Sequence, residues 1–346
     1  MIKKSYFNNL FVVFLIILCI LFCLAACDNS YGLEYSINAD NKTCTITGIG
    51  NYNSIDVIIP EKIGQYTVVA ISDNAFAEYN IISVSLPNTI ERIGKGAFSY
   101  CSHLERINIP PKVTVIEEGT FTYCTSLKSI ELPEGITRIN ESAFQQCDSI
   151  TSIVFPSTLT YIGVGAFLGC NSLSELVLPE GLKEIDRVAF AYCESLSEAN
   201  IPASVESIYI SFVCCASLES INVDSRNTHY ISIDGVLYDH SKTILKGYPS
   251  GKIAISFTVP AHVISIDLWA FSENEHLQEI YLSSNVQKIN DHMIYNCHNL
   301  KSINYNDTVV RWYAIHKRSE WDKYTDDYTI YCTDGQISKN GTVTYN

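Results

Sequence analysis

A period of 23 residues dominates the middle of the chain and constrains its fold more than any other feature. Three residue types keep this period. The prolines are Pro87, Pro110, Pro133, Pro156, Pro179 and Pro202. The phenylalanines are Phe98, Phe121, Phe144, Phe167 and Phe190, and weaker copies open at Phe76, Phe212, Phe271 and Ile294. The cysteines are Cys101, Cys124, Cys147, Cys170 and Cys193. When the repeats are aligned, these prolines, phenylalanines and cysteines form three columns with one spacing. Such columns indicate a repeat protein, in which each unit contacts mainly its neighbours.

Each repeat has the pattern of one coil of a solenoid. Ile130 and Leu132 have the alternating spacing of a short strand, and Pro133 ends it because proline has no N–H to donate to a sheet. Ile139 then points back inward, and Phe144 closes the coil from the far side. One coil alone cannot bury these side chains, so they are expected to pack against the same side chains of adjacent coils.

The unit A-F-x-x-C-x-x-L-x-x-I-x-L-P-x-x-V-x-x-I resembles the leucine-rich repeats of the BspA-like type, which occur on bacterial surfaces and in some parasitic protists. The resemblance extends from residues 34–37 and 45–50, through 233–238, to 331–335. It implies a curved leucine-rich-repeat solenoid with a parallel β-sheet on one face and short helical or irregular segments on the other. The roles described for the family are adhesion and protein binding, so neither catalysis nor a cofactor is expected.

We expect the solenoid to span residues 33–310, with a β-hairpin inserted at about 224–256. Val223 and Val259 look like equivalent strand positions but are 36 residues apart instead of 23. The β-rich runs 230–238 and 243–248 would form the hairpin, joined by residues 239–242. Two interpretations of its tyrosines stay open: they form a contact patch, or they pack the base of the hairpin. These residues are Tyr230, Tyr238 and Tyr248.

Residues 311–346 are predicted to form a C-terminal cap, because the core of a solenoid is open at its ends. Trp312, Tyr313, Ile315 and Trp321 have helical spacing and suit such a cover. Asn340-Gly341 is a favoured two-residue turn and is expected to close a last hairpin.

The first 27 residues have the features of an export signal. Lys3 and Lys4 precede an uncharged, proline-free run from Leu10 to Ala26. Leu24-Ala25-Ala26-Cys27 resembles the lipobox of bacterial lipoproteins, in which the cysteine is acylated and becomes the first residue. This predicts a signal peptide at 1–27, lipidation of Cys27, a linker at 28–32 and a membrane partner reached through the lipid anchor. The alternative is an uncleaved membrane anchor.

Charge and motifs exclude several classes of function. The chain has 23 basic and 37 acidic side chains, a net charge of −14, which argues against nucleic acid as a partner. The glycine-rich segments 94–96 and 163–165 precede the Ala-Phe column, so the repeat explains them, and no G-x-S-x-G sequence occurs. A hydrolase whose residues are distant in sequence stays open as the third hypothesis.

The cysteine column continues to Cys215 and Cys297, and Asn274 takes its place in one coil. Leucine-rich repeats often place an asparagine there, whose side chain bonds to backbone at the turn. A cysteine is a small, buriable substitute with a weak S–H donor. We favour buried free thiols over disulfides between stacked coils, since stacked side chains point in parallel. No metal is expected, because no C-x-x-C or C-x-x-H cluster occurs.

The strand residues that lie between the inward positions are expected to point outward and to form the candidate protein-binding face. They include four glutamates against one arginine, with two adjacent valines at the centre. The candidates are Arg106, Asn108, Glu131, Val154, Glu175, Val177, Glu198, Asn200, Glu279 and Tyr281. An apolar centre in an acidic surface fits an extracellular or host protein with a basic surface. The alternative is a solvated sheet of a structural surface layer without a dedicated ligand.

Overall fold

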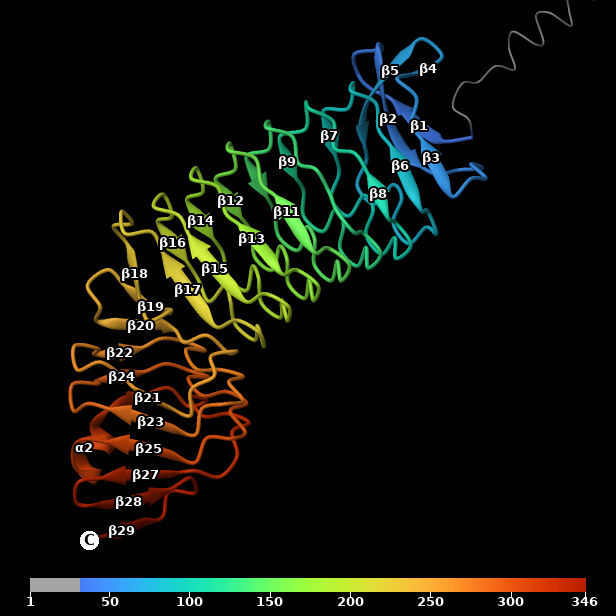
Figure 1. Cartoon of the computed structure of the whole chain (residues 1–346). Coiled ribbons are helices and arrows are strands. Elements are labelled where there is room, and N and C mark those ends of the chain that lie inside the picture. Colours follow the sequence, from blue (N-terminus) through green and yellow to red (C-terminus); the bar gives the residue numbers. More distant parts are fainter. Residues whose placement is uncertain (1–31) are drawn as a thin grey trace, which may run out of the picture.

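The structure, a computed structural model, describes residues 32–346, which form one stack of coils with a bend around residues 220–247 (Figure 1). Paired residues of neighbouring coils in the repeat region are 23 positions apart, such as Ile139 with Ile162 and Ile153 with Leu176. The predicted solenoid with its repeat of about 23 residues is confirmed. We call residues 32–223 the N-terminal arm and 244–346 the C-terminal arm. The predicted signal peptide, Cys27 and residues 28–31 of the linker lie outside the described residues.

The longer strands of the coils form a parallel sheet, the main sheet, along one face. In the N-terminal arm its strands are β3 (Asp56–Ile58), β6 (Ser83–Ser85), β8 (Arg106–Ile107), β11 (Ser152–Val154), β13 (Glu175–Val177), β15 (Glu198–Ile201) and β17 (Ser220–Val223). Between β8 and β11, the coil contributes only a bridge from Glu131 to Val154. Burial alternates along each strand, so Ile153 and Leu176 are buried while Val154 and Val177 face outward.

A second parallel ladder, the narrow sheet, lies after the proline turn. Its strands are β9 (Val115–Ile116), β10 (Arg138–Ile139), β12 (Tyr161–Ile162), β14 (Glu184–Ile185) and β16 (Ser207–Ile208). The resemblance implied short helical or irregular segments on this side, and the ladder was not predicted. Each strand has two residues and buries only the second, so it carries no alternating pattern that sequence reasoning can detect.

The third side of each coil is a tight turn around the Ala-Phe pair. Residues two before and two after each phenylalanine have positive φ, for example Gly119 at 60° and Tyr123 at 58° around Phe121. Glycine adopts this conformation without cost, which explains why the glycine-rich segments precede the Ala-Phe column. Backbone bonds join consecutive turns: Phe121 N–H donates to Ala143 O at 2.8 Å and Phe144 N–H donates to Ala166 O at 2.7 Å.

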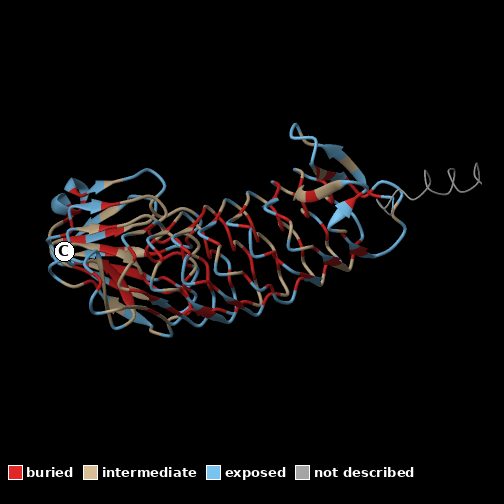
Figure 2. Ribbon diagram, turned by 90° about the horizontal axis from the view of Figure 1, so that it is seen from above, coloured by how far each residue is buried: buried red, intermediate tan, exposed pale blue. Residues whose placement is uncertain are grey.

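The side chains of the phenylalanine and cysteine columns are buried in the interior. Figure 2 shows that buried segments recur from coil to coil along the stack. Phe144 lies between Phe121 and Phe167, with ring centroids 5.3 Å and 5.1 Å away and nearly parallel planes. The predicted thiols are free and buried, and Cys147 Sγ donates to Phe121 O of the preceding coil at 3.1 Å. At the corresponding position, Asn274 Nδ2 donates to Ser250 O at 2.9 Å. The cysteine column therefore bonds to backbone as the asparagine does.

The insert differs in detail from a single hairpin. The first β-rich run of the insert, predicted at residues 230–238, is itself a hairpin of β18 (Tyr230–Ile233) and β19 (Val236–Asp239). Strand β19 also pairs with the antiparallel β20 (Ile244–Gly247). The tight turn lies at Asp234-Gly235, where Gly235 has a φ of 77°. Tyr238 and Tyr248 are buried, and the Tyr230 hydroxyl accepts from Ile208 N–H at 2.9 Å. These contacts support packing of the hairpin base, not a contact patch.

The C-terminal arm repeats the two-sheet arrangement. Its narrow sheet contains β20, β22 (Ser265–Ile266), β24 (Lys288–Ile289) and β26 (His316–Lys317). Its main sheet contains β21 (Ser256–Thr258), β23 (Glu279–Leu282), β25 (Ser302–Tyr305), β27 (Thr329–Cys332), β28 (Gly335–Ser338) and β29 (Val343–Tyr345). The insert separates the two arms into distinct hydrophobic clusters, one on each side of β19.

Different elements close the two ends. At the N-terminus, β1 (Glu34–Ile37), β2 (Thr43–Gly48), β4 (Lys62–Ile63), β5 (Tyr66–Ile71) and β7 (Arg92–Ile93) form one sheet. Near the C-terminus, helix α2 (Val309–Ala314) buries Trp312 but leaves Tyr313 exposed. The parallel ladders continue through β26 and β27, inside the segment expected to be the cap. The antiparallel β28 and β29 then cover the last coil, and Asn340-Gly341 lies in the turn that joins them.

Candidate functional site

The outer surface of the main sheet in the N-terminal arm carries eight of the ten candidate residues. Val154 and Val177 are 78% and 76% exposed and face each other across β11 and β13. The parallel register extends this row to Glu131 on one side and to Asn200 on the other. Two apolar side chains thus stand almost fully in water at the centre of a polar sheet. We call residues 131, 154, 175, 177, 198 and 200 the outer patch.

The carboxylates of the outer patch have no cationic partner within the described part of the chain. Glu131 and Glu175 form no ion pair there, and Glu198 accepts a single hydrogen bond, from Asn222 Nδ2 at 2.6 Å. Glu175 is paired with Ser152 in the register, and Glu198 with Ser220, so uncharged side chains lie beside them. The patch therefore has a negative potential that no lysine or arginine of the same sheet neutralises.

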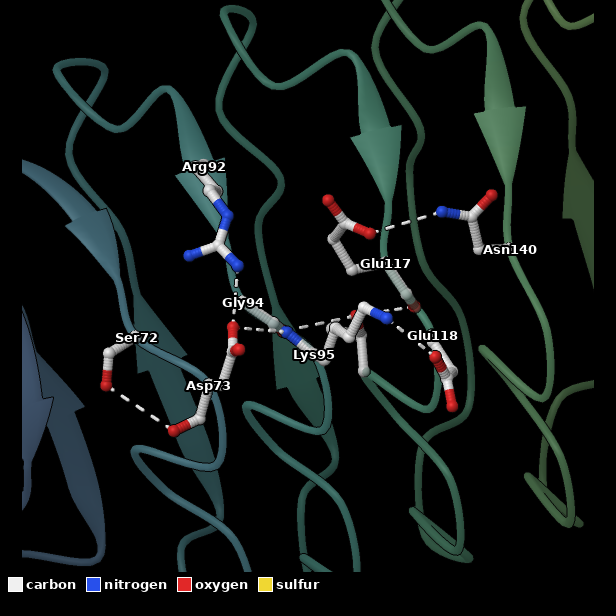
Figure 3. A network of polar contacts seen from close by, with 9 residues as sticks. Ser72, Asp73, Arg92, Gly94, Lys95, Glu117, Glu118 and Asn140 are labelled. Carbon is white, nitrogen blue, oxygen red and sulfur yellow. Dashed lines mark hydrogen bonds and ion pairs between the residues drawn. The ribbon is translucent and has the colours of Figure 1, made fainter.

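Charges on the opposite side of the coils behave differently, because many of them are paired between neighbouring coils. In Figure 3, Asp73 accepts from Arg92 at 2.6 Å and from the Lys95 N–H at 3.0 Å, and Lys95 Nζ lies 2.8 Å from Glu118. Further along, Lys183 bonds to Glu206 at 2.8 Å and lowers the pKa of that carboxyl. The pairs join one coil to the next through opposite charges, whereas the carboxylates of the outer patch form no ion pair within residues 32–346, and only Glu198 bonds to a neighbouring coil, through Asn222.

Arg106 and Asn108 are not part of the outer patch and line a groove of about 570 Å³ over β3, β6 and β8, which extends to Glu131. Asn108 Nδ2 donates to Leu86 O, and its Oδ1 accepts from Leu86 N–H, both at 2.8 Å. Arg106 lies 3.5 Å from Glu105 and is otherwise in solvent. Asn108 therefore joins neighbouring coils, while the guanidinium of Arg106 is the one candidate that is basic.

Glu279 and Tyr281 do not lie with the other candidates. They belong to β23 in the C-terminal arm, on a main sheet that the insert separates from β17. The Tyr281 hydroxyl donates to Glu279 Oε2 at 2.7 Å. The sequence pattern identified them as outward residues of equivalent coils and predicted an insert before them, but it did not predict that the main sheet ends at this insert.

Sequence reasoning also missed outward residues of this surface. Ile58 on β3 is 63% exposed beside Ser85. In the C-terminal arm, Tyr331 on β27 pairs with Asn304 and is 46% exposed. The missed signal was alternation: Val57 and Ile330 are buried, so their neighbours at both sides must point outward.

The thiols of the cysteine column are buried, and none of them is activated as a nucleophile. Burial raises the pKa of Cys101 and of Cys170 to about 12, and it raises the pKa of Cys147 well above its usual range. The thiolate is the nucleophilic form, so these residues stay protonated and unreactive in the folded protein. Within residues 32–346, no three His, Cys, Asp or Glu side chains are grouped to hold a metal ion. Nor does any helix in that range have the length and apolar character needed to cross a bilayer.

The family model for BspA type leucine rich repeat regions matches residues 51–157, 137–244 and 248–316, which together are well over half of the chain. The chain belongs to the BspA-type leucine-rich repeat family. A comparison with curated protein sequences finds no significant match.

Solved structures with the same fold come from several bacteria. A leucine rich cell surface protein from Faecalibacterium prausnitzii has 24% identity and a TM-score of 0.67, over 83% of this chain and 97% of that one. A leucine-rich repeat protein from Bacteroides ovatus has 27% identity and a TM-score of 0.64, over 79% and 70% of the two chains. The pneumococcal vaccine antigen PcpA has 21% identity and a TM-score of 0.60, over 86% of this chain and 80% of that one. The BspA-type fold is therefore present along most of this chain.

Proposed function

We propose that this BspA-type protein is a non-catalytic binding module of the cell surface, which holds an extracellular protein on the outer patch. The observation that carries the proposal is the combination of the exposed valine pair with unpaired carboxylates. Desolvating two adjacent valines favours association, and the surrounding glutamates select a partner segment with lysine or arginine. The column of thiols supplies no catalytic nucleophile, because these side chains are buried and burial raises their pKa.

A binding screen tests this function directly. The soluble protein without residues 1–27 is immobilised, and extracellular matrix and secreted host proteins are passed over it. We expect saturable binding of a basic partner that weakens as salt rises from low to physiological concentration, because exposed charges are then screened. If no partner in the screen binds saturably, the structural surface-layer hypothesis is favoured instead.

We further propose that the protein is anchored to the outer side of a membrane by acyl chains on Cys27. The lipobox-like sequence 24–27 supports this location, and the Faecalibacterium relative is itself described as a cell surface protein. Cells fed a clickable fatty-acid analogue should label the wild-type protein, whereas C27S should carry no label and appear in the medium or as an uncleaved precursor. Equal labelling of the two proteins would contradict the lipid anchor.

A further inference from the structure

The main sheet of the C-terminal arm has a groove that differs in chemistry from the outer patch. It has a volume of about 490 Å³ and crosses the ends of β21, β23, β25 and β27. Its walls include Pro260, Tyr281, Asn304 and Tyr331, and none of its lining side chains is charged. A groove lined only by uncharged side chains indicates a neutral ligand that is recognised by ring contacts and hydrogen bonds.

One row of the parallel register lines this groove. Thr258, Tyr281, Asn304 and Tyr331 pair in sequence across the four strands. The two tyrosines are therefore separated by two strand spacings, about 9.6 Å, with the asparagine between them. They are 39% and 46% exposed, so both rings have free surface. The row presents two aromatic platforms at a fixed distance.

The surrounding contacts hold this arrangement in place. The Tyr281 hydroxyl is bonded to Glu279 Oε2, which fixes the direction of the ring. Asn304 Nδ2 donates to Ser302 Oγ at 3.2 Å, and the opposite amide oxygen makes no bond within residues 32–346. The groove thus supplies one free acceptor and one further N–H midway between the rings.

We infer that this groove binds a proline-rich segment of a partner protein in the polyproline II conformation. That helix rises about 3.1 Å per residue with three residues per turn, so its repeat is about 9.3 Å and matches the separation of the two tyrosines. Prolines three residues apart would each lie on one ring, as in other aromatic-lined grooves for such segments. The carbonyls of this helix make no internal bonds, so the amide of Asn304 can donate to one of them. The groove crosses three strand spacings, about 14 Å, enough for between four and five residues.

Other extended ligands fit the row less well. A strand added to the sheet needs a free edge, whereas the groove lies on the face of the sheet. An amphipathic helix needs a continuous apolar channel, and here Asn304 interrupts the apolar surface between the tyrosines. The inference extends the proposed binding function to a second site, and its test uses no residue of the outer patch.

The test uses fluorescein-labelled decaproline and the soluble chain without residues 1–27, measured by fluorescence anisotropy. We expect saturable binding to the wild-type protein. The affinity should fall at least about tenfold in Y281A and in Y331A, because the loss of one ring contact costs about 1.4 kcal/mol or more. Y281F and Y331F should retain most of the binding, because they keep the rings. The matched control is Y313A, which removes an exposed tyrosine of α2 outside the groove.

Three results would overturn the inference. The first is an absence of saturable decaproline binding to the wild-type protein. The second is binding that Y281A, Y331A and N304A leave unchanged, which would place the peptide elsewhere. The third is binding of cellohexaose, but not of decaproline, at the same tyrosines, which would assign the groove to saccharides. Thermal melts of each variant separate a lost contact from a lost fold. If Y281A fails to fold, Y331A and N304A decide the question.

Discussion

F144A is expected to lower the free energy of unfolding by about 3–5 kcal/mol, the usual cost of removing a fully buried aromatic ring. Phe144 is 0% exposed and contacts equivalent rings in both neighbouring coils. The cavity would lie in the middle of the stack, where the backbone bonds of the turns hold the coils at a fixed separation and prevent collapse. Guanidinium denaturation followed by circular dichroism measures the change.

V154A is the matched control for this prediction. It also shortens an apolar side chain of the repeat region, but Val154 is 78% exposed, so stability should change by less than about 0.5 kcal/mol. Because a solenoid is stabilised mainly by contacts between neighbours, hydrogen exchange should locate the F144A defect in the adjacent coils. A loss below about 1 kcal/mol for F144A would contradict the stacked interior.

The double charge reversal E175K/E198K is expected to weaken binding of the partner found in the screen by at least about tenfold at low salt. Two attractive carboxylates would become two repulsive ammonium groups beside the exposed valines. Both glutamates are free of ion pairs within the described residues, so their removal breaks no salt bridge, and the melting temperature should stay nearly constant. Affinity is measured by biolayer interferometry with the soluble protein.

The control for E175K/E198K is a second double variant that changes the net charge by the same amount but lies on another side of the coils. E91K/E206K replaces carboxylates that bond to Lys112 and Lys183 outside the main sheet. These exposed pairs contribute little to stability, so the variant should fold and should bind nearly as well as the wild type. Equal weakening by both double variants would indicate a general charge effect and would remove the outer patch as the contact surface.

The interior of the protein was predictable because identical layers impose identical environments. A column such as Cys101 to Cys193 repeats only if each member meets the same neighbours, so a period in the sequence becomes a stack in space. The same logic gave the outward direction of Val154 and Glu175, since alternation along a strand leaves only two faces.

Features that break the repeat were not predictable in this way. The turn at Asp234-Gly235 divides a run that reads as one strand, and Gly235 has a positive φ and lies so close to Ser220 of the preceding coil that a side chain would not fit there. The separation of Tyr281 from the outer patch follows from that same insert. The tyrosine row needs Tyr331, whose strand is followed by antiparallel pairs and so lacks the repeat pattern.

Labelling of native thiols tests the layered interior most directly. The soluble protein without residues 1–27 is incubated with iodoacetamide before and after denaturation, and modified cysteines are identified by mass spectrometry. The column from Cys101 to Cys215, together with Cys297, should stay unmodified in the native protein and react fully in guanidinium without a reductant, because these thiols are buried and unpaired. Rapid native labelling of the column, or disulfides between its members, would contradict the account.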